Sequence, residues 1–356
     1  MKKLVLLVLL TFGLVCASSA KDLTKNSRWP AAKAWQWSAQ QGWLVGCNFI
    51  PSTAVNQLEM WQAETFDPRT IDRELGWAEN LGFNVVRVYL HHLAWQIDRQ
   101  GFKKRVGQFL NIASQHGIKT IFVFFDDCWN PEYHAGQQPK PKPGIHNSGW
   151  VRDPGTLIFT NPNLTDTLEV YLKDILSTFA RDQRVLAWDL YNEPGNSGLG
   201  LKSMPLLKNV FIWAREIDPS QPLTSGLWNP ALKNFNRFQL AHSDIITYHN
   251  YNDLKNHKAA IDTLKKYDRP LICTEYMARL RNSRFQNILP MLKKEHIGAI
   301  NWGLVAGKTN TIYGWNEPIP DGSEPKIWFS DILRKDGTPF DKAEIQLIKL
   351  LTKGNK

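Results

Sequence analysis

The sequence has few cysteines and shows no pattern of cross-links. It contains four in 356 residues, and the three that follow the N-terminal segment, Cys47, Cys128 and Cys273, are an odd number, so they cannot all pair. A disulfide framework is therefore not expected to hold the fold. No cysteine and histidine spacing resembles a zinc site, and we expect neither a metal nor another cofactor.

Long apolar runs are missing beyond the first residues. No later stretch approaches the roughly 20 uncharged residues of a membrane helix, so no stable membrane span is expected. The formal charge is +10, but the basic residues are scattered and form no stripe or recognisable module for nucleic acid. Nucleic acid is therefore not expected as a partner, and the sequence leaves the oligomeric state open.

A signal peptide is predicted over residues 1–20. Two lysines open the chain, an apolar run covers 4–15, and the small residues that end at Ala20 suit a signal peptidase. The protein is therefore expected to be secreted or periplasmic. Lipid anchoring through Cys16 is the less favoured alternative, because the preceding Val15 is bulkier than such processing prefers.

Short β-rich runs alternate with amphipathic stretches along the rest of the chain. The predicted strands are 43–49, 84–90, 120–125, 185–190, 223–227, 245–248, 270–274 and 299–303. The predicted helices are 70–81, 104–116, 164–181, 204–217, 254–267, 284–296 and 342–351, with a weaker candidate at 230–240. Eight such units favour an α/β fold, a single (β/α)8 TIM barrel.

The barrel is predicted to occupy 43–352, after a short N-terminal arm over 21–42. The connections that follow strands one, three and eight are long and cover 50–69, 126–163 and 304–341. Connections after a strand lie on the C-terminal face of a barrel, where barrel enzymes place their chemistry. These three loops are therefore expected to wall a cleft.

Two glutamates follow predicted strands at the positions where a barrel presents catalytic side chains. Glu193 comes just after strand four, and Glu275 comes just after strand seven. They are 82 positions apart, close to three βα units of roughly 30 residues each. Alone, each has an ordinary explanation: Asn-Glu-Pro is common turn chemistry, and Glu275 could pair with Arg279.

The segments Trp188-Asp189-Leu190-Tyr191-Asn192-Glu193-Pro194 and Thr274-Glu275-Tyr276 resemble the signatures of clan A glycoside hydrolases, nearest to family 5, the cellulase and mannanase family. The resemblance covers nearly all of the chain after the signal peptide. It implies hydrolysis of a β-linked poly- or oligosaccharide by double displacement, with Glu193 as acid/base and Glu275 as nucleophile.

The resemblance extends to charged and hydroxyl groups around the pair. Arg87 ends strand two, and Tyr251 follows strand six. Both are expected to favour the ionised form of Glu275, Arg87 by its charge and Tyr251 by its hydroxyl. Burial and the charge of Glu275 are expected to raise the pKa of Glu193, so that one carboxyl is protonated while the other is ionised.

Other matching residues are expected to contact the sugar. Asn192 is implied to bond the sugar 2-hydroxyl, His249 to bond substrate or the acid, and Trp302 to stack under the ring. Trp228, just past strand five, is a further candidate. Ordinary packing is the alternative for each of these residues.

Strand three departs from the family pattern. Family 5 enzymes commonly carry a histidine near its end, whereas this chain has Asp126-Asp127. Because adjacent strand residues face opposite ways, one of the two is expected in the cleft, and Asp127 is our candidate. His91, four residues after Arg87, is a further substrate-binding candidate. A histidine at this position resembles the pattern of other clan A families more than that of family 5.

Two other functions fit much of the same pattern. A non-catalytic carbohydrate-binding barrel would keep stacking aromatics without needing both glutamates, and a transglycosylase would use the same site with a sugar in place of water. A second Asn-Glu-Pro at 316–318 follows no buried strand, so Glu317 is interpreted as a turn residue. The sequence leaves open xylan, mannan, β-glucan and other glycans, and endo or exo action.

Overall fold

Eight parallel strands form the centre of the molecule. The computed structural model describes residues 28–354. The strands are β1 (Val45–Asn48), β2 (Val85–Tyr89), β3 (Lys119–Asp126), β4 (Val185–Asn192), β5 (Leu223–Thr224), β6 (Ile246–His249), β7 (Leu271–Tyr276) and β8 (Gly298–Trp302). Their order in the sheet is β5-β4-β3-β2-β1-β8-β7-β6. A parallel bridge between Leu227 and Tyr248 joins the two ends, so the predicted (β/α)8 barrel is confirmed.

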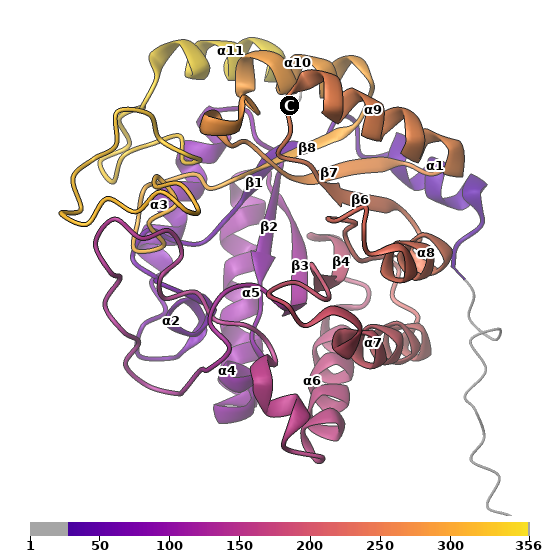
Figure 1. Cartoon of the computed structure of the whole chain (residues 1–356). Helices are drawn as coiled ribbons and strands as arrows, with labels where there is room; N and C mark the ends of the chain where they lie inside the picture. The colour runs from indigo at the N-terminus through magenta and orange to yellow at the C-terminus, as the bar shows by residue number, and fades with distance from the viewer. Residues whose placement is uncertain (1–27, 355–356) are drawn as a thin grey trace, which may run out of the picture.

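Helices surround the strands (Figure 1). They are α2 (Gln57–Trp61), α3 (Pro68–Asn80), α4 (His92–Ile97), α5 (Arg99–Gln115), α6 (Leu164–Phe179), α7 (Met204–Ile217), α8 (Lys233–His242), α9 (Leu254–Leu264), α10 (Phe285–Lys294) and α11 (Lys342–Thr352). Single turns of 3-10 helix lie at Gly155–Phe159, Gly200–Ser203, Lys265–Tyr267 and Arg279–Arg281. The sequence did not predict α4, and β5 is shorter than the predicted strand 223–227.

Local sequence sets several helix starts. Asp67, Asp253 and Asp341 precede α3, α9 and α11, and each side chain accepts a hydrogen bond from a backbone N–H in the first helical turn. These N–H groups have no partner inside the helix, so the caps stabilise the helix ends. The helices can therefore begin directly after the loops that follow the strands.

The bottom of the barrel is filled by small and branched side chains. Val85, Ile121, Ile245 and Ile300 pack together there, and Ala34 of α1 (Ala31–Ala39) belongs to the same cluster. The described part of the arm therefore covers the N-terminal ends of the strands. The predicted signal peptide, residues 1–20, lies outside the described residues.

The other end of the barrel carries the long connections. Apart from the short helix α2 after β1 and one stretch of 3-10 helix before α6, they have no helix or strand in the part of the chain that the structure describes. The loops after β3 and β8 run side by side and are joined by hydrogen bonds, for example from Ile319 N to Gly144 O at 3.1 Å (Figure 1). No helix among residues 28–354 is long and apolar enough to cross a membrane.

Candidate active site

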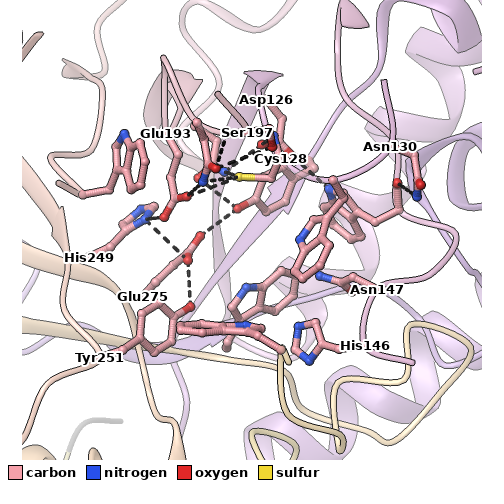
Figure 2. Close-up of a pocket in the computed structure, with 18 of the residues that line it drawn as sticks. Asp126, Cys128, Asn130, His146, Asn147, Glu193, Ser197, His249, Tyr251 and Glu275 are labelled. Carbon is pink, nitrogen blue, oxygen red and sulfur yellow. Dashed lines mark hydrogen bonds and ion pairs between the residues drawn. The ribbon is translucent and has the colours of Figure 1, made fainter. Parts of the chain in front are cut away.

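A cavity of about 720 Å³ opens at the C-terminal ends of the strands. Five of the predicted residues line it together with Glu193 and Glu275 (Figure 2). These five are Asn192, Trp228, His249, Tyr251 and Trp302. Arg87 lies beneath the cavity floor, fully buried, and reaches the site through its contact with Glu275.

The two glutamates face each other across His249. Nδ1 of His249 lies 2.7 Å from Oε1 of Glu193 and 3.4 Å from Oε2 of Glu275. One oxygen of each carboxylate and a nitrogen of the imidazole all lie within 4.8 Å of one another. Both carboxylates are nearly buried, at 9% and 4% exposure. The separation of the two carboxylates is therefore short enough for both to act on one bond, with no room for a water between them.

Donors hold Glu275 from two sides. Arg87 Nη1 and the hydroxyl of Tyr89 each donate to Oε1 at 2.9 Å, and the hydroxyl of Tyr251 donates to Oε2 at 2.7 Å. Arg87 also pairs with the buried Asp189 at 2.8 Å. Burial alone would lower the pKa of Arg87, but the neighbouring Tyr89, Asp189 and Glu275 raise it well above its usual range, so its positive charge is permanent.

Donors also surround Glu193, and this overturns one expectation. Burial raises its pKa, but the hydrogen bond and charge of His249, with donors from Cys128 and Asn196, outweigh burial and lower it. The pKa of His249 is raised in turn, because Glu275 and Glu193 outweigh its burial. The predicted rise of the Glu193 pKa is therefore wrong for the free protein, because the contact with His249 favours the ionised form of Glu193.

The oxygens of the two carboxylates are occupied by proton donors rather than left open. His249, Cys128 and Asn196 serve Glu193, while Arg87, Tyr89 and Tyr251 serve Glu275. A cation at this cluster would have to displace these donors and lie near the Arg87 guanidinium. The donor set fits a pair of carboxylates that exchange protons better than it fits a metal ion.

Glu193 sits on a strained turn. Its φ is +45°, in the left-handed region that few residues other than glycine adopt. Asp127 holds this turn from below, because its carboxylate accepts hydrogen bonds from the Tyr191 hydroxyl at 2.7 Å, Gly195 N at 2.7 Å and the Ser203 hydroxyl at 2.5 Å. Asp127 does not line the cavity, so its predicted contact with substrate is corrected to support of the Glu193 turn.

Asp126 takes the place in the cavity that we expected for Asp127. It accepts hydrogen bonds from Trp150 Nε1 at 2.7 Å and Asn192 Nδ2 at 2.8 Å. Burial raises the pKa of Asp126 to about 7, although these hydrogen bonds oppose the rise. Val123 packs inside the barrel, so strict alternation of side chains along β3 would also place Asp127 inside. Phe124 and Phe125 instead both pack outward. This shifts the alternation by one residue and places Asp126 inside.

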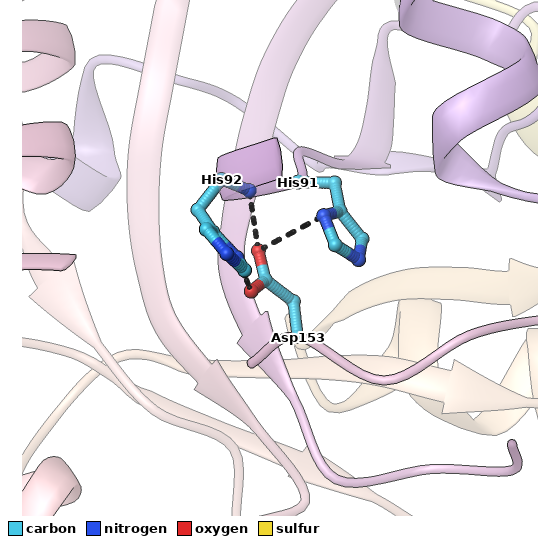
Figure 3. Close-up of side chains that lie close together, drawn as sticks. All are labelled: His91, His92 and Asp153. Carbon is cyan, nitrogen blue, oxygen red and sulfur yellow. Dashed lines mark hydrogen bonds and ion pairs between the residues drawn. The ribbon is translucent and has the colours of Figure 1, made fainter. Parts of the chain in front are cut away.

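His91 also lies outside the cavity. It caps α4, with Nδ1 accepting from Leu93 N at 3.2 Å, and its Nε2 lies 3.2 Å from Arg152 O. His91, His92 and Asp153 form a buried cluster in which Asp153 bonds both the backbone and the ring of His92 (Figure 3). The predicted substrate contact of His91 is therefore wrong. The cluster instead ties the start of α4 to the loop after β3.

Aromatic rings line the side of the cavity next to Glu275. Trp302 lies parallel to Tyr89, with centroids 6.2 Å apart, and Trp150 meets both rings edge-on. Rings in this arrangement offer a flat apolar face to a sugar. Trp150 is one of several loop aromatics that the sequence offers for stacking on a sugar, whereas Tyr89 was not predicted, although it follows Arg87 at the two-residue spacing that places both inside the barrel. Glu317 is exposed and outside the cavity, as expected of a turn residue.

Comparison with known families decides the class of protein. The family described as Cellulase (glycosyl hydrolase family 5) matches residues 54–307. The chain belongs to glycoside hydrolase family 5. This family 5 chain is therefore an O-glycosyl hydrolase of clan A, as its strand-end motifs predicted. No curated protein matches it.

Solved structures share the fold of this family 5 chain at low identity. An endo-β-1,4-mannanase from Thermotoga petrophila is 14% identical, with a TM-score of 0.56 over 89% of this chain and 77% of that one. An exo-β-1,4-mannosidase from Opitutaceae bacterium strain TAV5 is 15% identical, with a TM-score of 0.57 over 87% and 59%. A β-1,4-mannanase from Aplysia kurodai is 14% identical, with a TM-score of 0.51 over 80% and 95%.

Proposed function

We propose that this protein is an exported, retaining glycoside hydrolase that cleaves β-linked glycans, with Glu193 as acid/base and Glu275 as nucleophile. The observation that carries the proposal is the approach of the two carboxylates to within 4.8 Å at the floor of the cavity. Retaining enzymes need carboxyl groups about 5 to 5.5 Å apart, whereas inverting enzymes leave more room for a water. Export rests on the sequence of residues 1–20.

In the first step, Glu275 attacks the anomeric carbon. The donors on both of its oxygens fix the carboxylate in one orientation, and the positive charge of Arg87 lies beside it at 2.9 Å. Glu193 gives its proton to the glycosidic oxygen, so the aglycone leaves as an alcohol and the sugar remains as an ester of Glu275. In the second step, Glu193 takes a proton from water, which attacks the ester and restores Glu275.

Asn192 supports the transition state. Its Oδ1 accepts from Arg87 Nη2 at 2.7 Å, which fixes the amide, and its Nδ2 donates to Asp126 at 2.8 Å. The remaining contact of Nδ2 is a weak one, to Cys128 Sγ at 3.5 Å. A sugar 2-hydroxyl can therefore replace the sulfur as the partner of Nδ2, and such a bond strengthens as charge develops on the ring.

The proposal is tested by a substrate panel. Mannan-derived oligosaccharides come first, because solved structures with this fold include enzymes named for β-1,4-mannan, and xylan, cellulose and mixed β-glucan oligosaccharides complete the panel. We expect hydrolysis of at least one β-linked substrate. Proton NMR of the first products should show the β-anomer before mutarotation. An α-anomer as first product would exclude the retaining mechanism, and no hydrolysis of any β-linked substrate would favour a binding barrel.

The shared proton predicts the basic limb of the pH profile. Glu193 must be protonated to act as acid, and it draws that proton from His249, whose pKa is raised above 6.5. The pair holds one proton more tightly than Glu193 holds it alone, because either group can carry it. We therefore expect kcat/KM to fall only above pH 6.5, and the His249→Asn variant to lose activity at lower pH. Initial rates from pH 4 to 9 measure both limbs, and a basic limb that is unchanged in the variant would contradict a shared proton.

A further inference from the structure

Hydrogen bonds join the loops after β3 and β8 into one wall. Asn147 N donates to Thr309 O at 2.8 Å, and Asn310 Nδ2 donates to Lys142 O at 2.8 Å. These bonds add to the one between Ile319 and Gly144 described above. Residues 142–150 and 309–319 of the two loops together therefore form a continuous bridge over one side of the cavity, rather than two independent lids.

The bridge lies on the side of Glu275. Trp150, at the end of its β3 part, meets Trp302 edge-on with centroids 5.5 Å apart. Trp315, from its β8 part, meets Tyr251 edge-on at 4.9 Å. The opposite side, next to Glu193, ends in the exposed Ser197 and has no such bridge in the described part of the chain. Figure 2 shows His146 and Asn147 of the bridge on the far side of Glu275 from Glu193.

The two sides of the cavity would hold different parts of the substrate. The acid protonates the oxygen that leaves with the aglycone, so the aglycone lies beside Glu193 and the sugar that is attacked lies over Trp302. Any further sugar on the attacked side would be linked through a hydroxyl of that first ring that points away from the aglycone. His146, Asn147, Trp150 and Trp315 of the bridge line the cavity on that side and so lie across the path of such a chain. Only a ring whose outer hydroxyls are free can therefore bind there.

Unpartnered polar atoms on the inner face of the bridge suit free hydroxyls. Both amide atoms of Asn147 lack a hydrogen-bond partner among the described residues, as does Nε2 of His146, and both residues are buried and line the cavity. Burial lowers the pKa of His146 to about 4, so the ring is neutral, and Nδ1 donates to Tyr313 O at 2.8 Å. Its Nε2 is therefore a free acceptor. Buried polar atoms without partners are rare and call for an occupant.

We propose that this enzyme releases single sugars from the non-reducing ends of β-linked oligosaccharides, and that His146 and Asn147 recognise hydroxyls of the terminal ring. The inference rests on the proposed retaining hydrolysis and adds the end of the chain at which it acts. Asn147 offers a donor and an acceptor, and His146 offers an acceptor, so the three atoms discriminate sugars by the placement of their hydroxyls. The left-handed backbone of Asn147, with φ +48°, fixes the amide in this position.

The wild-type enzyme tests the proposal through its first products. The probes are β-1,4-mannohexaose, cellohexaose and xylohexaose, each with a fluorescent label at the reducing end. Release from the non-reducing end gives an unlabelled monosaccharide and a labelled pentamer before any shorter labelled product. A mixture of labelled dimer, trimer and tetramer from the first turnovers would overturn the proposal while leaving retaining hydrolysis intact. Absence of hydrolysis from all probes and from aryl β-glycosides would instead overturn the proposed function.

Two glycines of the same loop give a matched pair of variants. A Cβ on Gly144 would lie 1.7 Å from Ile319 O, so Gly144→Ala must push the bridge apart. A Cβ on Gly136, which also has a positive φ, meets nothing within 4 Å. We expect Gly144→Ala to raise the share of internal cleavage at least 10-fold and Gly136→Ala to leave the products unchanged. Equal product patterns in the two folded variants would contradict closure by the bridge.

Asn147→Gly separates recognition from closure and does not depend on moving the bridge. Glycine keeps the left-handed backbone and removes only the amide. We expect kcat/KM on a monosaccharide aryl β-glycoside to fall about 3- to 10-fold, the effect of one or two hydrogen bonds. The ratio of kcat/KM between manno- and gluco-configured aryl glycosides should also change. An unchanged ratio would show that Asn147 does not read the sugar.

Discussion

Replacing Glu275 with Gln is expected to lower kcat/KM on every hydrolysed substrate by about 10⁴-fold or more, the loss that removal of a nucleophile causes in other covalent mechanisms. The amide has nearly the same shape as the carboxylate but cannot attack the anomeric carbon. One amide oxygen can still accept from Arg87 Nη1 and the Tyr89 hydroxyl, so the floor of the site is expected to stay in place. Steady-state kinetics with an aryl β-glycoside measures the loss.

A second buried glutamate provides the control for this variant. Glu344 pairs with Arg279 at 2.6 Å, far along the chain from the cavity and not lining it. Glu344→Gln makes the same chemical change to an arginine-paired carboxylate and is expected to lower thermal stability while keeping kcat/KM within a few-fold. If Glu275→Gln kept more than about 1% of the wild-type activity, Glu275 would not be the nucleophile.

The charges around the pair explain why these buried acids can coexist. Arg87 is fully buried and contacts both Asp189 and Glu275, so its one positive charge faces two carboxylates. His249, whose pKa is raised by both carboxylates, contacts Glu193 at 2.7 Å and offsets its charge when protonated. Removing either group would leave an uncompensated buried carboxylate, which is costly. The same balance lets a proton move between His249 and Glu193 without a change in the net charge of the site.

The sequence predicted the catalytic frame because its signals are local. A buried strand followed at once by Asn192 and Glu193, or by Glu275, places a side chain at the barrel mouth whatever the loops do. Arg87 and Tyr251 were predicted from the resemblance to family 5, and both contact Glu275. The order of the strands and the resemblance together therefore indicate most of the site.

The errors arise where tertiary structure overrides local pattern. Asp127 was preferred over Asp126, but the inward phase of β3 shifts before its end, and this depends on how Phe124 and Phe125 pack against the helices. His91 follows β2 closely, yet the chain turns into α4 there and uses the ring as a helix cap. The lowered pKa of Glu193 depends on its distance from His249, which lies 56 positions away in the chain.

Loop geometry is the other part that the sequence could not supply. The long connections were recognised by their length, but whether they leave a groove or close a pocket depends on contacts such as that between Gly144 and Ile319. Nothing in the local sequence around either residue signals the other. Closure of one side of the cavity therefore depends on contacts between two loops that are distant in the sequence.

Glu193→Ala is expected to affect substrates according to their leaving groups. For oligosaccharides, whose leaving alcohol needs a proton, kcat/KM should fall about 10²- to 10⁴-fold, the usual contribution of a general acid. For dinitrophenyl β-glycosides, which leave without a proton, the first step should be nearly unaffected. The second step then becomes slow because no base activates water, so the ester on Glu275 should accumulate and appear as a burst of phenolate followed by a low steady-state rate.

Azide should restore turnover in this variant and identify the role of Glu193. The small anion fits the space left by the side chain and attacks the ester without needing a base, so the product should be a β-glycosyl azide, detectable by NMR. Glu317→Ala, which alters the exposed second Asn-Glu-Pro, is the control. Its kcat/KM should stay at the wild-type level on both kinds of substrate, and azide should not change its products. An α-glycosyl azide would place the anion on the opposite face and reverse the assignment of the two carboxylates. Equal losses on oligosaccharides and dinitrophenyl glycosides, without a burst, would mean that Glu193 orients the substrate rather than transferring the proton.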